Sequence, residues 1–293
     1  PSGVPTLSDC VLIPDIALSN NRSPIADNTN IPTGIPIPPT LASALNLTVE
    51  TNGYVEILSS TNLQVMDWIH LDGIIDIRDS GSLIQVYESG PNINDNTGNG
   101  IINMQRTVPN GVNSYDYIYW SSPTDEDFNV TDISAATGEL IYEWNPTLNG
   151  ITHGDWIAAS GNMSKGKGYI VRGLVPDTGV PTNTTEFSGK PQNGVITVPI
   201  NRGTHTSGPY TSSGDFQATN EDDNWNLIGN PYPSAISYAD FITANPNIDG
   251  TIYFWTHQTA PSYQYSPFYY DFIYNYSDEY IDNNFTGSNP ATF

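Results

Sequence analysis

Residues 45–86 read LNLTVETNGYVEILSSTNLQVMDWIHLDGIIDIRDSGSLIQV, a succession of short segments in which apolar and polar residues alternate. Alternation with a period of two is typical of β-strands that bury one face. The dipeptides Asn52-Gly53, Asp72-Gly73 and Ser80-Gly81 lie between these segments and are turn signals. The pattern therefore predicts short strands at residues 45–49, 54–57, 63–65, 74–77 and 83–86, and another at 101–104.

The predicted strands return at a nearly constant interval. Val55 and Ile75 are 75 − 55 = 20 residues apart, and Leu63 lies 16 residues after Leu47 and 20 before Leu83. A strand and turn that recur at such an interval are typical of a β-solenoid, in which each coil buries its inner face on the next. We therefore expect a short right-handed β-solenoid within residues 1–110, behind a proline-rich entry segment with one or two short strands.

From residue 111 onward the interval is lost and aromatic residues become frequent. Short apolar segments between turn signals predict a β-sandwich over residues 111–293, incomplete in this chain or completed by residues from elsewhere. One helix is expected at 234–244, with Ser237 as its cap and Asn245-Pro246 after its end. The fold class is thus all-β, and the sandwich strands are expected at 115–120, 140–144, 168–172, 184–188, 194–199, 225–228, 250–256 and 267–274.

The composition excludes several classes of protein. The 293 residues carry 8 Lys and Arg against 31 Asp and Glu, a net charge of −23. Nucleic-acid binding and docking on anionic membranes both need a basic surface, and no apolar run is long enough for direct membrane insertion. An acidic, cation-poor surface is typical of an exported protein, so we expect an extracellular location. The single cysteine, Cys10, forms no internal disulfide, and its apolar neighbours predict a buried position.

No motif identifies a catalytic residue. The segment 161–168 is close to a phosphate-binding loop, but Gly168 stands where that loop needs Ser or Thr, and a strand follows instead of a helix. No pair of carboxylates is singled out for acid–base chemistry. We therefore expect no enzymatic activity. The four histidines match no zinc-ligand spacing, and each is interpreted as standing alone: His70, His153, His205 and His257.

Calcium is the one cofactor that the sequence suggests. Calcium takes several oxygen ligands from Asp, Glu and Asn side chains in turns. The densest carboxylate clusters are Glu221-Asp222-Asp223 and the pair Asp125 and Asp127, neither of which has the EF-hand spacing. We treat both clusters as candidate calcium sites, with a solvated acidic loop as the alternative for each.

The C-terminal region is rich in tyrosine. Tyr253 and Trp255 alternate on one predicted strand, and Tyr269 belongs to a run of tyrosines over residues 263–280. Alternating aromatic rings on a strand form a flat platform that suits sugar rings, although such rings also pack sandwich cores and edges. These three residues are the candidate glycan-binding residues.

Four strings identify a family resemblance: DYIYWSSP at 116–123, GKGYIVRG at 166–173, WNLIGNPYPSAI at 225–236 and IDGTIYFWTH at 248–257. Together they resemble the region upstream of the C-terminal sorting domain in large surface proteins of Bacteroidetes bacteria, which the type IX secretion system exports. Gliding-motility adhesins belong to this group. The resemblance covers nearly the whole chain, but its strings are structural and name no catalytic residue. The tyrosine-rich stretch after Thr259 departs from the family pattern, as does the absence of a further glycine-containing strand and a sorting module before Phe293.

The resemblance implies a non-catalytic structural or adhesion module of a large adhesin on the cell surface. Its partners would be the type IX secretion machinery during export, and then surface glycans or neighbouring adhesin domains. The first alternative is a carbohydrate-binding module that uses the aromatic C-terminal region. The second is a polysaccharide-degrading enzyme on the solenoid.

Overall fold

A computed structural model describes residues 5–15, 25–26, 41–86, 96–108, 117–125, 128–133, 140–147, 154–172, 184–203, 208–209, 217–218, 225–248, 250–255, 280–283 and 288–290. Within these residues the chain is mostly β-structure, with a 3₁₀ turn η1 (Val130–Asp132) and a helix α1 (Tyr238–Ala244). The all-β prediction is confirmed at this level. Among the described residues, no helix is long and apolar enough to cross a membrane.

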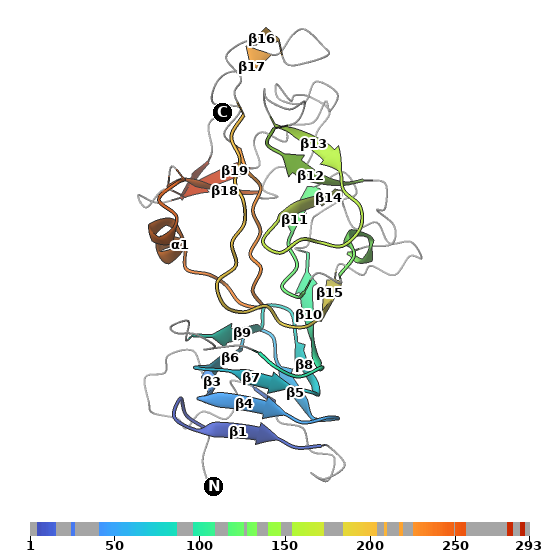
Figure 1. The fold of residues 1–293 in the computed structure, drawn as a ribbon, viewed down its shortest axis with the longest axis vertical. Helices are drawn as coiled ribbons and strands as arrows, with labels where there is room; N and C mark the ends of the chain where they lie inside the picture. Colours follow the sequence, from blue (N-terminus) through green and yellow to red (C-terminus); the bar gives the residue numbers. More distant parts are fainter. Residues whose placement is uncertain are drawn as a thin grey trace.

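Three parallel sheets form the N-terminal part, and the chain from β4 to β9 visits them in turn (Figure 1). The first sheet contains β1 (Cys10–Ile13), β4 (Asn46–Val49) and β7 (Ile69–Leu71). The second contains β2 (Ile25–Ala26), β5 (Tyr54–Ile57), β8 (Ile74–Ile77) and β10 (Ile101–Thr107), with β15 (Thr184–Gly189) antiparallel to β10. The third contains β3 (Leu41–Ala44), β6 (Asn62–Val65) and β9 (Ser82–Gln85).

The register explains the sequence interval. Val55 lies opposite Ile75 and Leu63 lies opposite Leu83, so the 20-residue spacing is a true distance between stacked strands. The 16-residue spacing is not, because Leu47 pairs with Ile69 and Leu63 belongs to another sheet. The analysis missed β3 and β7, since strands of three or four residues are too short to show a clear alternation.

Alternate side chains of these strands point into a shared apolar interior. In β4, β5 and β6 every second residue is buried, which matches the period of two in the sequence. Ile57, Val65, Ile75 and Ile77 are completely buried. Each contributes about 1.5–3 kcal/mol relative to an exposed position, so this interior is the main source of stability.

One corner of the stack has no space for side chains. A Cβ added to Gly73 would lie 2.2 Å from the carbonyl oxygen of Gly53, and one added to Gly100 would lie 2.2 Å from that of Gly73. Glycine is needed here because each coil turns directly over the backbone of the coil before it. The turn signal at Asp72-Gly73 therefore reflects a close approach between coils.

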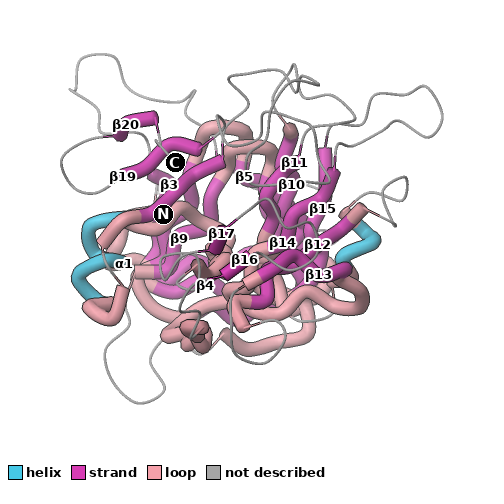
Figure 2. Tube along the Cα trace, turned by 90° about the horizontal axis from the view of Figure 1, so that it is seen from above, coloured by secondary structure: helices cyan, strands magenta, loops and turns pink. Residues whose placement is uncertain are grey.

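The C-terminal part contains a four-stranded antiparallel sheet in the order β11 (Tyr117–Trp120), β14 (Tyr169–Arg172), β12 (Ile141–Asn145), β13 (Asp155–Ala158). A second sheet consists of β18 (Ile252–Trp255), β19 (Tyr280–Asn283) and β20 (Ser288–Pro290), and β16 (Gly208–Pro209) pairs with β17 (Gln217–Ala218). Helix α1 lies on the opposite side of the molecule from β12 and β13 (Figures 1 and 2).

Several strand predictions in this part need correction. Residues 194–199 and 225–228 form no strand, and the latter contribute only an isolated bridge between Ile228 and Lys167. The prediction of a sandwich strand at 184–188 is wrong in its partner, because β15 extends the sheet of β10. The strand β13 was not predicted. Residues 267–274 lie outside the described residues.

Helix α1 begins at Tyr238, four residues after the predicted start. Ser237 is its cap, as predicted, and its hydroxyl accepts a hydrogen bond from the amide of Asp240. A capping residue has extended backbone geometry, so the helix begins only after it. Asn245 ends the helix one residue before Pro246.

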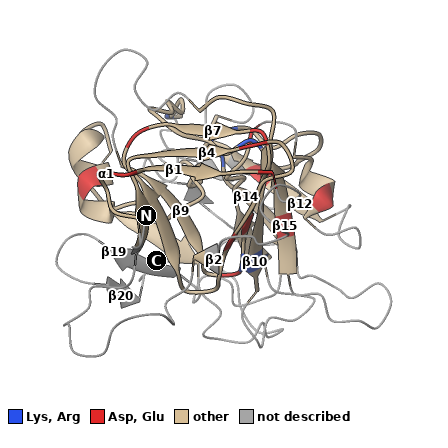
Figure 3. Cartoon of the chain, turned by 90° about the horizontal axis from the view of Figure 1, so that it is seen from below, with Lys and Arg blue, Asp and Glu red and all other residues tan. Residues whose placement is uncertain are grey.

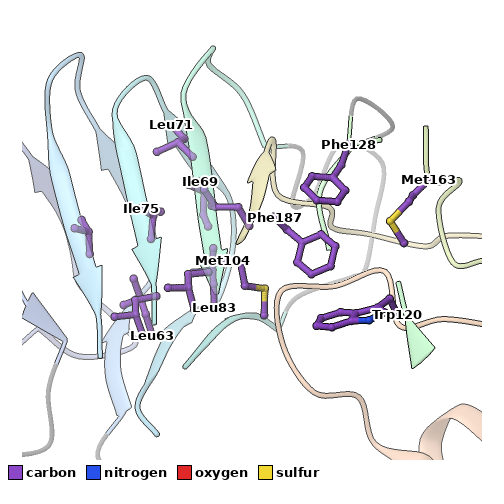
Figure 4. Close-up of a cluster of buried hydrophobic side chains, with 14 of the residues drawn as sticks. Leu63, Ile69, Leu71, Ile75, Leu83, Met104, Trp120, Phe128, Met163 and Phe187 are labelled. Atoms are coloured by element: carbon purple, nitrogen blue, oxygen red, sulfur yellow. The ribbon is translucent and has the colours of Figure 1, made fainter. Parts of the chain in front are cut away.

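A single hydrophobic cluster connects the two parts. Figure 4 shows Met104 of β10 and Phe187 of β15 beside Phe128 and Trp120 of the C-terminal part. The ring of Phe187 lies 4.7 Å from that of Phe128 and 5.9 Å from that of Trp120. The core therefore continues across the division predicted near residue 110.

Candidate functional sites

The structure describes only one of the predicted calcium ligands. Asp125 accepts a hydrogen bond from the amide of Lys190 at 3.1 Å, and its own amide donates to the carbonyl oxygen of Lys190 at 3.0 Å. Its carboxylate thus joins two segments. Among the described residues, no group of three or more His, Cys, Asp or Glu is placed to hold a metal ion. The other candidates lie outside the described residues: Asp127, Glu221, Asp222 and Asp223.

Acidic residues do not gather on one face of the described structure. Figure 3 shows Asp and Glu on several separate strands and turns, with few Lys or Arg among them. The negative charge therefore belongs to a solvated surface spread over the fold.

The predicted glycan-binding residues Tyr253 and Trp255 lie two positions apart on β18, so they share one face of that strand. The centroid of the Trp255 ring lies 5.5 Å from that of Tyr119 on β11. The Tyr253 ring lies 4.8 Å from that of Trp225, and each of these two residues is 36% exposed. Tyr269 lies outside the described residues.

These rings belong to a larger group that we call the aromatic belt: Tyr119, Trp144, Trp156, Trp225, Tyr253 and Trp255. Trp144 and Trp156 are directly opposed on β12 and β13, with ring centroids 5.2 Å apart, and Trp156 lies 6.3 Å from Tyr119. The indole nitrogen of Trp144 donates to the carbonyl oxygen of Trp225 at 2.8 Å. The belt connects β18 to the four-stranded sheet, and each aromatic pair adds about 0.5–1.5 kcal/mol beyond its buried area.

Trp225 was predicted to begin a buried strand, and this was wrong. It is exposed at the rim of the belt, beside Tyr253. The belt thus combines a packed interior with an accessible edge that consists of these two rings.

A ladder of polar side chains follows the sheet of β5, β8, β10 and β15. Glu56, Asp76, Asn103 and Ser188 occupy successive positions in register. Asp76 accepts from Asn103 at 2.8 Å, and Ser188 donates to Asn103 at 2.8 Å. Arg78 donates from its Nε atom to Glu56 at 2.6 Å. The ladder is a set of mutual contacts between coils.

Tyr54 belongs to the same ladder. Its hydroxyl donates to Asp76 at 2.7 Å. Partial burial, together with this hydrogen bond, raises the pKa of Tyr54 from 10.0 to about 12, because both disfavour the phenolate. The tyrosine therefore remains protonated at neutral pH and acts as a donor between coils.

His70 does not stand alone, contrary to the sequence prediction. Its Nδ1 atom lies 2.7 Å from the hydroxyl of Thr97, and its Nε2 atom lies 3.0 Å from a carboxylate oxygen of Asp72. Sequence reasoning missed this group because Thr97 comes 97 − 70 = 27 residues after His70. The same 27-residue offset relates Ile74 to Ile101, so the coil register brings the two side chains together.

Three of the strings that carry the family resemblance meet at one place, which we call the string junction. The amide of Gly229 donates to the carbonyl oxygen of Gly166 at 2.9 Å, and the amide of Gly168 donates to that of Leu227 at 3.3 Å. Ser121 donates from its hydroxyl to the carbonyl oxygen of Asn230 at 2.7 Å. A Cβ on Gly229 would lie 2.2 Å from the Cβ of Ser121, so glycine is required by the close approach.

The corner at 229–233 connects the string junction to the parallel sheets. The side chain of Asn230 donates to the carbonyl oxygen of Ser234 and accepts from the amide of Tyr232. The carbonyl oxygen of Pro233 accepts from the amide of Leu83 in β9 at 2.9 Å. The third string therefore contacts the last strand of one parallel sheet.

The glycine-rich segment 161–168 leads into β14, as its interpretation as a turn predicted. Lys167 forms an ion pair with Glu143 at 2.8 Å, and its ammonium group lies 5.9 Å from the centroid of the Tyr169 ring. Its charge is thus directed to a neighbouring carboxylate. Cys10 is exposed on β1, so the prediction of a buried position was wrong.

Comparison with known proteins assigns the chain to a family. The model of a domain of unknown function, DUF8693, matches residues 1–293, and the chain belongs to this family. No curated protein and no solved structure matches the chain. Function must therefore be argued from the strings and the geometry.

Proposed function

We propose that this protein is a non-catalytic structural and adhesion module on the bacterial cell surface. It is exported by the type IX secretion system of Bacteroidetes and forms part of a large adhesin. The observation that carries the proposal is the string junction, where three of the four strings that resemble this group contact one another through backbone hydrogen bonds. These strings build the fold, which supports a relationship to a structural region of such adhesins.

The proposal includes a finer description of the fold. Residues 1–110 form a short right-handed β-solenoid, and residues 111–293 form a sandwich-like domain at one end of it. The successive visits of β4 to β9 to three parallel sheets support the solenoid. The contact of Trp255 in β18 with Tyr119 in β11 supports two sheets that face each other.

A stack of this kind suits a role in display. Each coil contacts mainly its neighbours, so the stack forms an extended and quasi-one-dimensional unit. Side chains such as Asp76, Asn103 and Arg78 bond to the adjacent coil, which stiffens the stack. These groups therefore serve the spacer and are not available as a separate catalytic set.

Export is tested in the native bacterium. Intact cells carrying an epitope-tagged chain are treated with protease, and the tag is followed in wild-type cells and in cells that lack the type IX outer-membrane translocon. We expect cleavage at the surface of the wild type and retention inside the translocon mutant. Equal surface exposure in both strains would exclude this export route. Sustained turnover of any polysaccharide by the purified chain would exclude the non-catalytic assignment.

A second candidate function is carbohydrate binding, with surface glycans as partners. The exposed rim of the aromatic belt favours it, because Trp225 and Tyr253 are each 36% exposed and lie side by side. Half-exposed aromatic rings present an apolar face to which a sugar ring binds. On a glycan array we expect binding that Trp225→Ala or Tyr253→Ala abolishes. Phe254→Ala is the matched control, since Phe254 is 49% exposed on the opposite face of β18.

We also propose calcium as a stabilising ion at the acidic loops around Asp125–Asp127 and Glu221–Asp223. The support is the carboxylate density of these two segments. Calcium would then link loops of the C-terminal part and add to its stability.

A further inference from the structure

We propose that Thr97 is an acyl-acceptor site, whose hydroxyl is activated by His70 and Asp72 and takes an acyl group from small activated esters or thioesters. The inference rests on the geometry of these three residues and is independent of the proposed surface role. Each molecule accepts one acyl group, so this is a modification site and not a cycle of turnover.

The three side chains have the order of a nucleophile, a base and an orienting carboxylate. The hydroxyl of Thr97 lies 2.7 Å from Nδ1 of His70, and Nε2 of His70 lies 3.0 Å from Asp72. A nucleophile within hydrogen-bond reach of a base, with the base oriented by a third group, is the arrangement that activates a hydroxyl.

Asp72 determines which nitrogen of His70 carries the proton. The carboxylate accepts hydrogen bonds only, so Nε2 of a neutral His70 must be the protonated nitrogen. Nδ1 then has a free lone pair and accepts from the hydroxyl of Thr97. The hydroxyl proton already points at the base that removes it.

Asp72 is itself held in place and ionised. Its Oδ1 atom accepts from the amide of Asn99 at 3.0 Å, while its Oδ2 atom faces His70. The hydrogen bond from Asn99, with a smaller contribution from His70, lowers the pKa of Asp72. The carboxylate is therefore charged at neutral pH, as an orienting group requires.

The backbone positions Thr97 rigidly. Its amide donates to the carbonyl oxygen of Ile69 at 3.0 Å, and its carbonyl oxygen accepts from the amide of Leu71 at 2.9 Å. These bonds flank His70, so Thr97 and His70 are neighbours across a parallel bridge and their side chains share one face. Catalytic groups act best when rigid elements fix their geometry in this way.

The group is accessible from solvent. The side chains of His70 and Asp72 are 40% and 32% exposed, and Thr97 is exposed as well. Next to Thr97 the chain turns sharply at Gly98, whose φ of +98° is a conformation that favours glycine. A small acyl donor therefore reaches the hydroxyl from the outer surface of the stack.

The chemical step is a simple acyl transfer. The oxygen of Thr97 forms a bond to the carbonyl carbon of the donor, and Nδ1 of His70 takes the hydroxyl proton. The tetrahedral intermediate collapses, the bond from carbon to the leaving oxygen or sulfur breaks, and the proton passes from His70 to the leaving group. The products are an ester of Thr97 and a free alcohol or thiol.

The test uses p-nitrophenyl acetate and the full chain, followed by peptide mass spectrometry. Hydroxylamine treatment separates an ester on a hydroxyl, which it cleaves, from acetylated amines, which it leaves intact. Thr48 is the internal control, because it lies opposite His70 on the other side of β7 while Nδ1 of His70 bonds to Thr97. We expect Thr97 to be acetylated about 100-fold faster than Thr48, since a positioned general base contributes about 10²–10⁴-fold.

Variants assign the roles. Thr97→Val is expected to abolish the ester, and Thr97→Ser to retain it. His70→Gln and Asp72→Asn are expected to slow acetylation of Thr97 by about 10-fold or more while circular dichroism shows the same fold. Equal acetylation of Thr97 and Thr48, or an unchanged rate at Thr97 in the folded His70→Gln variant, would overturn the proposal.

Discussion

The amide of Gly229 donates to the carbonyl oxygen of Gly166 at 2.9 Å, joining segments that are 229 − 166 = 63 residues apart. The bond lies at the string junction, where Ser121 and Gly229 approach so closely that a Cβ on Gly229 would be 2.2 Å from that of Ser121. Long-range bonds of this kind explain why the strings consist of glycine, proline and small residues. Their composition serves backbone contact.

Gly229→Ala is expected to destabilise the protein by about 1–3 kcal/mol, as overpacking does in a well-packed site. The free energy of unfolding in urea measures the effect. Adding Ser121→Gly removes one of the two clashing groups and should restore part of the loss, although the hydrogen bond from Ser121 to Asn230 is lost with it. Strictly additive effects of the two substitutions would show that the predicted contact is absent.

Phe187→Ala should lower the stability of both parts of the molecule together. Phe187 is 1% exposed and contacts Phe128 and Trp120 across the division near residue 110. Truncation of a buried Phe costs about 3–5 kcal/mol. Scanning calorimetry should show one transition at a lower temperature. Val195→Ala, at a position that is 82% exposed, should leave the transition unchanged. Two transitions, of which only one shifts, would show two independent domains.

Stability should fall at alkaline pH because of Tyr54. Its pKa is about 12 in the folded protein and 10.0 in the reference state, so the folded state holds the proton more tightly. This contribution is complete below pH 10 and is lost as the pH rises through about 12. Tyr54→Phe removes the ionisable group, and its free energy of unfolding should fall less steeply over that range than that of the wild type. Parallel curves for the two proteins would contradict the role of Tyr54.

Calcium should raise the melting temperature of the protein if the acidic loops bind it. A ligand that binds only the folded state at 100 times its dissociation constant adds about 2.7 kcal/mol. Asp222→Asn with Asp223→Asn should reduce the shift, while Asp240→Asn, on the first turn of α1, should not. An identical melting temperature in calcium and in chelator would exclude a stabilising site.

Much of the parallel part could be predicted from the sequence. The predicted strands at 54–57 and 74–77 coincide with β5 and β8, and the stacking of Val55 on Ile75 follows from their spacing. The cap at Ser237 was also predictable, because capping depends on a few adjacent residues. The partner of β15 was not, since its alternation is compatible with any sheet that offers a free edge.

The polar contacts were less predictable than the strands. His70 carries no motif, and its position between Thr97 and Asp72 depends on the register of β7 with residues 27 positions later. Trp225 was assigned to a buried strand because its neighbours are apolar, whereas its rim position depends on β12 and β18. Neither environment is encoded within a short window of sequence.

By itself, the sequence determined the β class, the turns and the inward face of most strands in the stack. These properties are local, because alternation sets which side chains leave water and glycine sets where the backbone can turn. Only the tertiary structure decided which strands stack, where the strings meet, and that Thr97 lies against His70. Those choices depend on the free energy of contacts between residues far apart in the chain, which no local pattern contains.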